Sequence, residues 1–202
     1  MIIEKGSETA MLNIPYYERE PIFDILPVHK TRFFYGGRKQ LLYARTAFVR
    51  DDGFYFDLQK FERDPVLSAP GSFSDTDSAV AVSFDFSKTG TGPVFTALLN
   101  RAGSHAVYID SKEQSGYRFE EVYAYRGEDE QGWYWGVRIL ISLCMLSSVY
   151  PPTAFSPGDV VRGNAYAVMK EGPDAHFSAV SPFSEPSVFH IDNLHDFQIN
   201  NR

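Results

Sequence analysis

The chain has 202 residues, of which 44% are hydrophobic and 22% are charged, and it contains 17 Phe and 12 Tyr. This composition excludes a disordered chain and is sufficient for one folded domain. The formal net charge is -7, from 19 Lys and Arg against 26 Asp and Glu, and no basic run occurs. Nucleic acids and anionic membrane surfaces are therefore not expected as partners, because their phosphates would be repelled.

Cys144 is the only cysteine, so neither a disulfide within the chain nor a cysteine-based zinc site can form. Its apolar surroundings, residues 139–146, predict a small buried side chain, and a catalytic thiol is the alternative. Residues 1–10 lack the pattern of a signal peptide, and no apolar stretch reaches about 18 residues. As written the sequence fits a cytoplasmic protein, whereas removal of a signal peptide would fit a periplasmic or secreted one.

Residues 1–40 show weak periodicity and contain Pro15, Pro21 and Pro27. We expect them to wrap around the edge of a β-sandwich formed by residues 41–202, which would protect strand edges from pairing with other chains. Two strands are predicted at 41–50 and 53–61. The sequence Asp51-Asp52-Gly53 between them predicts a hairpin turn, because glycine tolerates a positive φ angle.

Apolar and polar residues alternate strictly further along the chain. In residues 78–86, Val80, Val82, Phe84 and Phe86 share one face, which belongs to a core. Further strands are predicted at 94–100, 104–109 and 117–126. The most apolar strand follows, with Trp133 and Trp135 on one face, and this spacing predicts that both indoles pack in the core.

After a segment at 147–157 that predicts one short helical turn, residues 160–169 form another strand, and the last 25 residues combine loop with a final short strand. Turn signals recur every 10 to 15 residues between strands rich in aromatic and β-branched residues. The fold class predicted is therefore all-β: an antiparallel β-sandwich with at most one or two short helical turns.

Four stretches in this order resemble the family 9 carbohydrate-binding modules and their stand-alone bacterial relatives, which are DOMON-like sandwiches. The first is Asp77 and Ser78 before an apolar strand, and the second is the strand 94–100, which ends in Asn before a turn of small residues. The third is Gly132 and Trp133 before the strand through 143. The fourth is the ordered series 162–166, 176–177, 181–182, 189–190 and 194–199. The resemblance covers about residues 40 to 199. It implies a sandwich that grips a sugar between aromatic rings, with hydroxyls bound by amides, carboxylates and Arg.

The chain also departs from the family pattern. Members place a Trp shortly before the Asp-Ser pair and another in the closing loop, where this chain has Phe73 and Phe189. A Glu and an Arg of the family are replaced by Val80 and Phe95. The pair of Trp rings that encloses the sugar in these modules, the sugar clamp, is thus altered. The identity of the ligand does not follow from the resemblance.

The candidate ligand-binding residues are Phe73, Asp77, Asn100, Arg101, Arg162, Asn164, Tyr166, His176, Phe189 and His190. Arg162, Asn164 and Tyr166 alternate on one face of a strand, where they could offer a guanidinium, an amide and a phenol to a sugar. The alternative is a solvated outer face or a salt bridge. His176 and His190 could instead orient loops by hydrogen bonds.

Metal binding is a weaker hypothesis. His190, Asp192, His195 and Asp196 form the densest cluster of potential ligands, although a strand would turn His195 to the other face, and a surface cluster is the alternative. Asp75 and Asp77 could hold a structural calcium, but no cofactor is otherwise expected.

No spacing of carboxylates, nucleophile elbow or phosphate loop supports an enzyme. The first hypothesis is therefore a non-catalytic domain that recognises a mono- or oligosaccharide through aromatic stacking and Arg/Asn hydrogen bonds. The second is an accessory domain that lost the sugar clamp and binds a protein partner. A glycoside-processing enzyme is the third.

Overall fold

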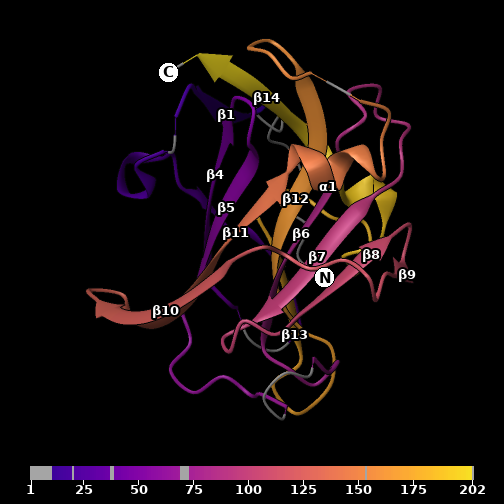
Figure 1. Ribbon diagram of the computed structural model, residues 1–202. Helices are drawn as coiled ribbons and strands as arrows, with labels where there is room; N and C mark the ends of the chain where they lie inside the picture. Colours follow the sequence, from indigo (N-terminus) through magenta and orange to yellow (C-terminus); the bar gives the residue numbers. More distant parts are fainter. Residues whose placement is uncertain (1–10, 20, 37–38, 69–72, 153, 202) are drawn as a thin grey trace.

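The computed structural model describes residues 11–19, 21–36, 39–68, 73–152 and 154–201. The strands form two facing layers (Figure 1). The first layer contains, in spatial order, β10 (Val122–Asp129), β11 (Gly132–Ser142), β5 (Gly53–Lys60) and β4 (Leu42–Val49), with β2 (His29–Lys30) beside β4. The second contains β14 (His195–Asn201), β12 (Val160–Met169), β6 (Ala79–Asp85), β7 (Phe95–Asn100), β8 (His105–Ile109) and β9 (Lys112–Glu113). On the edge of β12 lies β13 (His176–Ala179), which also pairs with β3 (Phe33–Gly36).

The core lies between the two layers and is dominated by phenylalanine. Phe56 of the first layer and Phe84 of the second have ring centroids 5.1 Å apart, and the centroids of Phe54 and Phe86 are 4.7 Å apart. These residues come from the alternating faces that the sequence indicates. The predicted all-β sandwich is confirmed.

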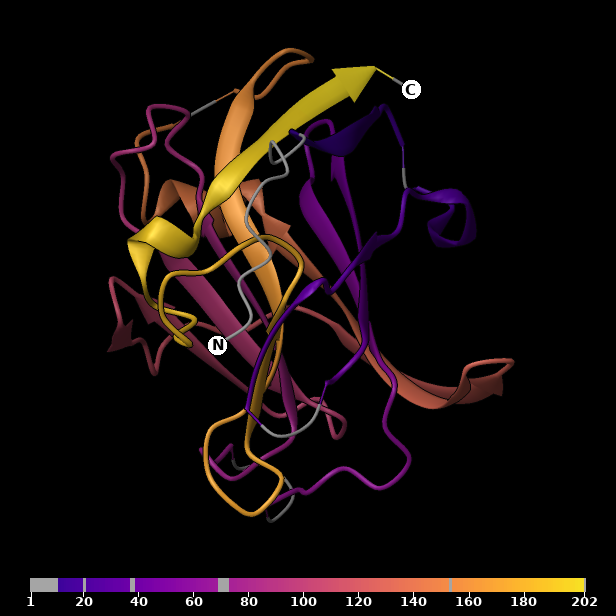
Figure 2. The ribbon, with the colours of Figure 1, turned by 180° about the vertical axis from the view of Figure 1, so that it is seen from behind.

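Strand β1 (Leu12–Tyr17) joins the two layers on the side seen from behind (Figure 2). It pairs in parallel with β14, Leu12 opposite Phe197, and with β4, Tyr16 opposite Phe48. Strands β1, β2 and β3 thus pair with strands of the sandwich, while residues 1–10 are outside the described part of the chain.

The Asp51-Asp52-Gly53 hairpin turn is confirmed, with Asp51 at φ 63° and Gly53 at φ 146°. The predicted strand 117–126 is wrong over 117–121, since β10 begins at Val122. Residues 117–121 form a loop whose Phe119 is buried against the His105 ring, with centroids 5.1 Å apart. Packing of this loop, and not strand pairing, explains its aromatic residues.

Helical structure among the described residues is limited to α1 (Leu143–Ser147), η1 (Phe23–Ile25) and η2 (Ile191–Asn193). The helical turn was expected at 147–157, but α1 ends at Ser147. Ser142 caps it, because its hydroxyl accepts a hydrogen bond of 3.1 Å from the Met145 amide. None of the helices within the described residues has the length and apolar character needed to cross a bilayer.

Two predictions about buried residues are wrong. Cys144 is exposed, because α1 turns it away from the core while Leu146 is buried. Trp135 is buried as predicted, whereas Trp133 is 43% exposed. Trp133 shares the face of Trp135, but the hairpin of β10 and β11 projects beyond the sandwich at that point (Figure 1).

Candidate functional site

The outer face of the second layer is covered by the protein itself. Ala79, Ala81, Tyr166 and Val168, on the side of β6 and β12 away from the main core, belong to a second apolar cluster with Leu98, Phe177, Ala179 and Val188. The polar residues of β12 were expected either to face a ligand or to face solvent. Instead, the segment after β13 buries most of this face, with Phe183 and Val188 packed in the cluster.

Asn164 holds the segment after β13 in place through hydrogen bonds. Its side chain is fully buried, and its Nδ2 donates to the Asn193 carbonyl at 2.9 Å and to the Ser181 carbonyl at 3.3 Å. Its Oδ1 accepts from the Ser181 amide at 3.0 Å. The amide group is thus used within the protein and does not reach solvent.

Tyr166 and His176 are also buried. The Tyr166 ring packs on Phe177 with centroids 5.1 Å apart, and burial raises the pKa of the Tyr166 phenol above its ordinary value. The Nδ1 atom of His176 lies 2.7 Å from the Asp174 carbonyl oxygen. In this structure neither side chain is accessible to a ligand.

Arg162 lies near the start of β12, whereas Lys170, beside Phe73 and Phe189, follows its end. Arg162 is paired with Asp85, whereas Val168 is paired with Ala79 at the far end of β6. Its Nη2 donates to the Leu194 carbonyl at 2.9 Å. The structure therefore does not bring Arg162 together with Phe73 and Phe189.

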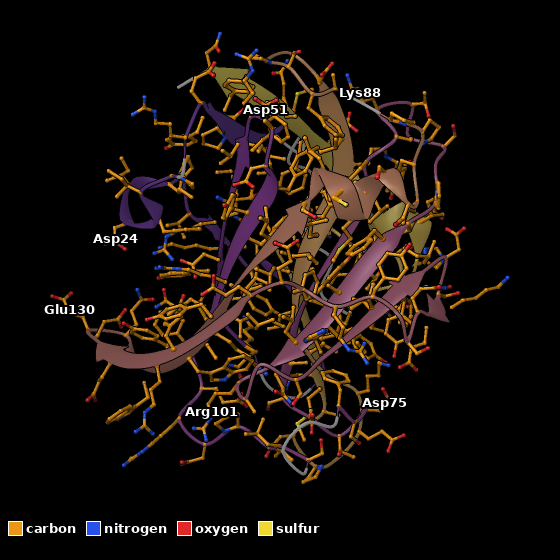
Figure 3. The ribbon with its side chains drawn as sticks, viewed as in Figure 1. Asp24, Asp51, Asp75, Lys88, Arg101 and Glu130 are labelled. Atoms are coloured by element: carbon orange, nitrogen blue, oxygen red, sulfur yellow. The ribbon has the colours of Figure 1, made fainter. Side chains whose placement is uncertain are left out.

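Asp77 and Asn100 form a buried pair at the end of the sandwich near Phe73. The Asp77 carboxylate accepts hydrogen bonds from the Ser68 amide at 2.5 Å and from the Asn100 Nδ2 at 2.8 Å. Both side chains are almost fully buried, so they hold loops in place. Arg101, which follows Asn100, is partly exposed at the same end of the molecule as Asp75 (Figure 3).

Phe73 and Phe189 do come close to a common residue, Lys170. The Lys170 Nζ lies 2.6 Å from Oδ1 of Asp75 and 5.5 Å from the centroid of the Phe189 ring. Phe73 and Lys170 line a shallow surface depression that encloses no cavity volume. Tyr108 completes this group, which we call the Lys170 site: its ring lies edge-on to Phe189 with centroids 4.9 Å apart.

The electrostatics of the Lys170 site keep Tyr108 in its neutral form. Burial raises the pKa of the Tyr108 phenol, and the negative charges of Glu113 and Asp75 raise it further. The site thus offers an ammonium group, a carboxylate, a phenol and two aromatic rings. Sequence reasoning missed Lys170 and Tyr108, although Lys170 directly follows a strand and Tyr108 alternates outward on another.

His190 lies beside acidic side chains, with its ring nitrogens 3.7 Å from a Glu185 oxygen and 3.9 Å from an Asp192 oxygen. His195 does not join it, since its Nε2 lies 2.9 Å from the Pro182 carbonyl. Among the described residues, no group of three or more His, Cys, Asp or Glu side chains is arranged to hold a metal ion.

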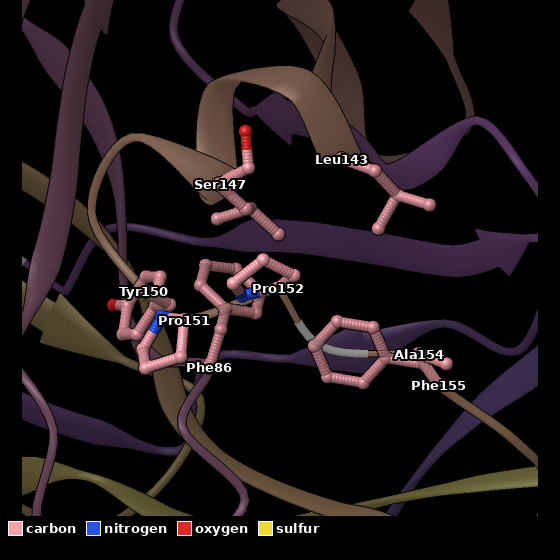
Figure 4. A pocket seen from close by; sticks show the side chains of 9 residues that line it. Phe86, Leu143, Ser147, Tyr150, Pro151, Pro152, Ala154 and Phe155 are labelled. Carbon is pink, nitrogen blue, oxygen red and sulfur yellow. The ribbon is translucent and has the colours of Figure 1, made fainter.

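The two positions where the family pattern would place Glu and Arg, Val80 and Phe95, both face the main core. The opposite end of the sandwich contains an apolar cavity of about 450 Å³ next to α1 (Figure 4). Its walls include Phe86, Leu143 and Phe155.

Comparison with known proteins finds similarity in structure only. No protein-family model and no curated protein matches the sequence. A "putative carbohydrate-binding protein" from Bacteroides uniformis superposes with a TM-score of 0.68 at 14% identity, over 96% of this chain and all (100%) of the other. The family 9 carbohydrate-binding module from Caldicellulosiruptor kristjanssonii superposes in its cellotriose complex with a TM-score of 0.64 at 9% identity, over 94% of both chains.

The chain has the family 9 carbohydrate-binding module fold. The glucose complex of the Caldicellulosiruptor kristjanssonii module agrees, with a TM-score of 0.65 at 9% identity over 95% of this chain and 96% of the other. The resemblance in the order of short motifs thus corresponds to a shared family 9 fold.

Proposed function

We propose that the protein is a non-catalytic carbohydrate-binding domain whose Lys170 site binds a neutral mono- or oligosaccharide. The observation that carries this proposal is the shared fold over nearly the whole chain with modules whose structures contain cellotriose and glucose.

The chemistry of the Lys170 site supports the same ligand class. A pyranose ring offers C–H groups that stack on an aromatic plane such as Phe189, and its hydroxyls can accept from Lys170 and donate to Asp75. The Lys170–Asp75 ion pair is partly exposed, so a sugar could share these groups without breaking a buried interaction.

Calorimetric titration of the full chain with glucose and with cellotriose tests the proposal. We expect binding that is weakened in Phe189→Ala. Phe34→Ala is a matched control, because Lys39 Nζ lies 5.6 Å from its ring centroid, as Lys170 does from Phe189. Absence of binding to any saccharide by the folded protein would contradict the proposal.

One observation favours a second function, an accessory domain that binds another protein. The cavity next to α1 is lined almost entirely by apolar groups, and the hydroxyl of its Tyr150 already donates to the Pro93 carbonyl at 2.6 Å. An apolar side chain of a partner would fit such a cavity better than a sugar would. A Leu143→Asp variant that loses a protein partner but keeps sugar binding would support this function.

A further inference from the structure

The outer face of the first layer carries an unusual set of aromatic and charged side chains. In β11, Trp135, Val137 and Ile139 face the core, so alternation turns Tyr134, Gly136 and Arg138 outward. We call this outward surface the tyrosine face; its residues are Tyr43 and Arg45 of β4, Asp57 and Gln59 of β5, Tyr134 and Arg138 of β11, and Tyr123 and Tyr125 of β10.

The tyrosine face lies on the side of the sandwich from which two other segments project. These are η1, where Asp24 is labelled, and the turn between β10 and β11, where Glu130 is labelled (Figure 3). The Lys170 site is elsewhere, on the second layer. The two surfaces therefore belong to different sheets of the sandwich.

Two tyrosines lie over glycines of the neighbouring strand. Tyr125 is paired with Gly136, and Tyr134 with Gly127. A Cβ at Gly136 would lie 2.3 Å from Cζ of Tyr125, and one at Gly127 would lie 2.4 Å from the Tyr134 hydroxyl. Each ring thus occupies the space above a glycine and covers its backbone. The Tyr125 ring also stacks beside Tyr123, with centroids 6.0 Å apart.

A buried carboxylate fixes the position of Tyr125. Asp57 is 2% exposed, and it accepts a hydrogen bond of 2.5 Å from the Tyr125 hydroxyl. Burial raises the pKa of Tyr125, and the charge of Asp57 raises it further, so the phenol stays neutral and keeps its donor proton.

Two arginines surround the same carboxylate. Arg45 Nη1 lies 3.4 Å and Arg138 Nε 3.5 Å from Asp57 oxygens, and Arg45 also donates to Oε1 of Gln59 at 3.3 Å. Burying charges in this way costs desolvation free energy that a solvated outer face does not require. Such an arrangement instead holds the rings and guanidinium groups in one geometry before a ligand arrives.

Arg138 retains capacity for a ligand. Its side chain is 33% exposed. Its guanidinium lies 4.4 Å from the ring centroid of Phe23 in η1, 5.4 Å from that of Tyr125 and 5.7 Å from that of Tyr123. Within the part of the chain that the structure describes, it makes the ion pair with Asp57 but no hydrogen bond of standard geometry. Donors beside aromatic rings are the combination that binds the hydroxyls and the C–H face of a sugar.

We propose that the exposed part of the tyrosine face, on β10 and β11, is a second saccharide-binding surface that takes a neutral oligosaccharide. Tyr123 is 52% exposed and Arg138 is 33% exposed, whereas Tyr43, Asp57 and Gln59 on β4 and β5 are buried. Acidic saccharides are disfavoured by the carboxylates of residues 128–130 at the hairpin turn. The proposal goes beyond the function proposed above, because either surface can bind sugar without the other.

The test is to titrate the isotope-labelled full chain with cellotriose, xylotriose and mannotriose and to follow assigned NMR signals. We expect shifts at Tyr123, Tyr125 and Arg138 that saturate with the sugar. Tyr123→Ala should weaken this response about two- to tenfold, the range of one aromatic contact. Tyr35→Ala is the matched control, because Tyr35 is 55% exposed on β3 and Tyr123 is 52% exposed.

The outcomes separate the two proposals. Shifts confined to Phe189 and Lys170 would overturn the second surface and support the first. Shifts confined to the tyrosine face would support the second surface and show that the Lys170 site is not used. Equal weakening in Tyr123→Ala and Tyr35→Ala would overturn the second surface, and no response to any of the three sugars would overturn both.

Discussion

Asn100 donates a hydrogen bond of 2.8 Å to Oδ2 of Asp77, and both side chains are buried. Asn100 is the last residue of β7, while Asp77 lies in the loop that precedes β6. The same carboxylate accepts from the amides of Ser68 and Ser74. One side chain thus fixes the loop that positions Phe73 at the Lys170 site.

Asp77→Ala should lower the free energy of unfolding by about 2 kcal/mol, because it leaves the buried Asn100 amide and two backbone donors without their acceptor. Denaturant unfolding measures this change. Asp24→Ala is the control, since Asp24 is exposed on η1 and should behave like the unaltered protein. Equal stability of the two variants would show that the Asp77 interactions do not stabilise the fold.

Glu62 should make stability depend on pH. Burial alone would raise its pKa, but the charge of Lys60, 3.3 Å away, and hydrogen bonds from Ser78 and Trp135 outweigh burial and hold the pKa below its ordinary value of 4.5. Because the pKa is lower in the folded state, the stabilisation is fully present above 4.5 and is lost as the pH falls below that value.

Glu62→Gln should therefore lose about 3 kcal/mol at neutral pH, since it removes the negative charge 3.3 Å from the buried Lys60 ammonium, and the difference from the unaltered protein should shrink in acid. Urea unfolding at several pH values checks this expectation. Glu18→Gln removes half of an exposed ion pair with Arg50 and should leave the unfolding midpoint unchanged. A constant difference at all pH values would contradict the assignment to Glu62 ionisation.

Gly136→Ala should displace the Tyr125 ring, because the new methyl group would lie 2.3 Å from it. We expect a loss of about 1–3 kcal/mol, typical of overpacking, together with a changed environment of Tyr125 in NMR spectra. Gly116→Ala is the matched change, since a Cβ at Gly116 has no atom within 4 Å. If both variants kept the stability and spectrum of the unaltered protein, Tyr125 would not lie against Gly136.

Cys144 should react with iodoacetamide in the native protein, because its side chain is exposed on α1. Intact mass measured over time without denaturant should show complete addition of one label, and Cys144→Ser should show none. Labelling that required denaturant would instead support the burial that the sequence predicts.

The sequence predicts the features of this fold that depend on neighbouring residues. The hairpin at Gly53 and the core face of Val80, Val82 and Phe84 follow from turn chemistry and alternation, and both are present. The outer side of β12 could not be predicted in this way. Asn164 and Tyr166 are polar residues on a strand, and only tertiary packing of the segment after β13 buries them.

The candidate site likewise contains residues that the sequence predicts and residues that only the tertiary structure brings together. The aromatic positions Phe73 and Phe189 follow from the order of motifs, and the structure places both near Lys170. Arg162 does not join them, because alternation predicts the face of a strand residue but not its distance along the strand from a loop. The tyrosine face was missed, because its members are spread over four strands and meet only through the register of those strands.

The parallel pairing of β1 with β14 has a consequence for how quickly the protein reaches its native state. Asn13 and Asn200 hydrogen-bond across a sequence separation of 187 residues. Contacts between residues so far apart in the sequence form only after most of the chain has come together, and they slow folding. During synthesis on a ribosome, β14 is the last strand to emerge, so the edges of β1 and β12 that pair with it stay unpaired until then.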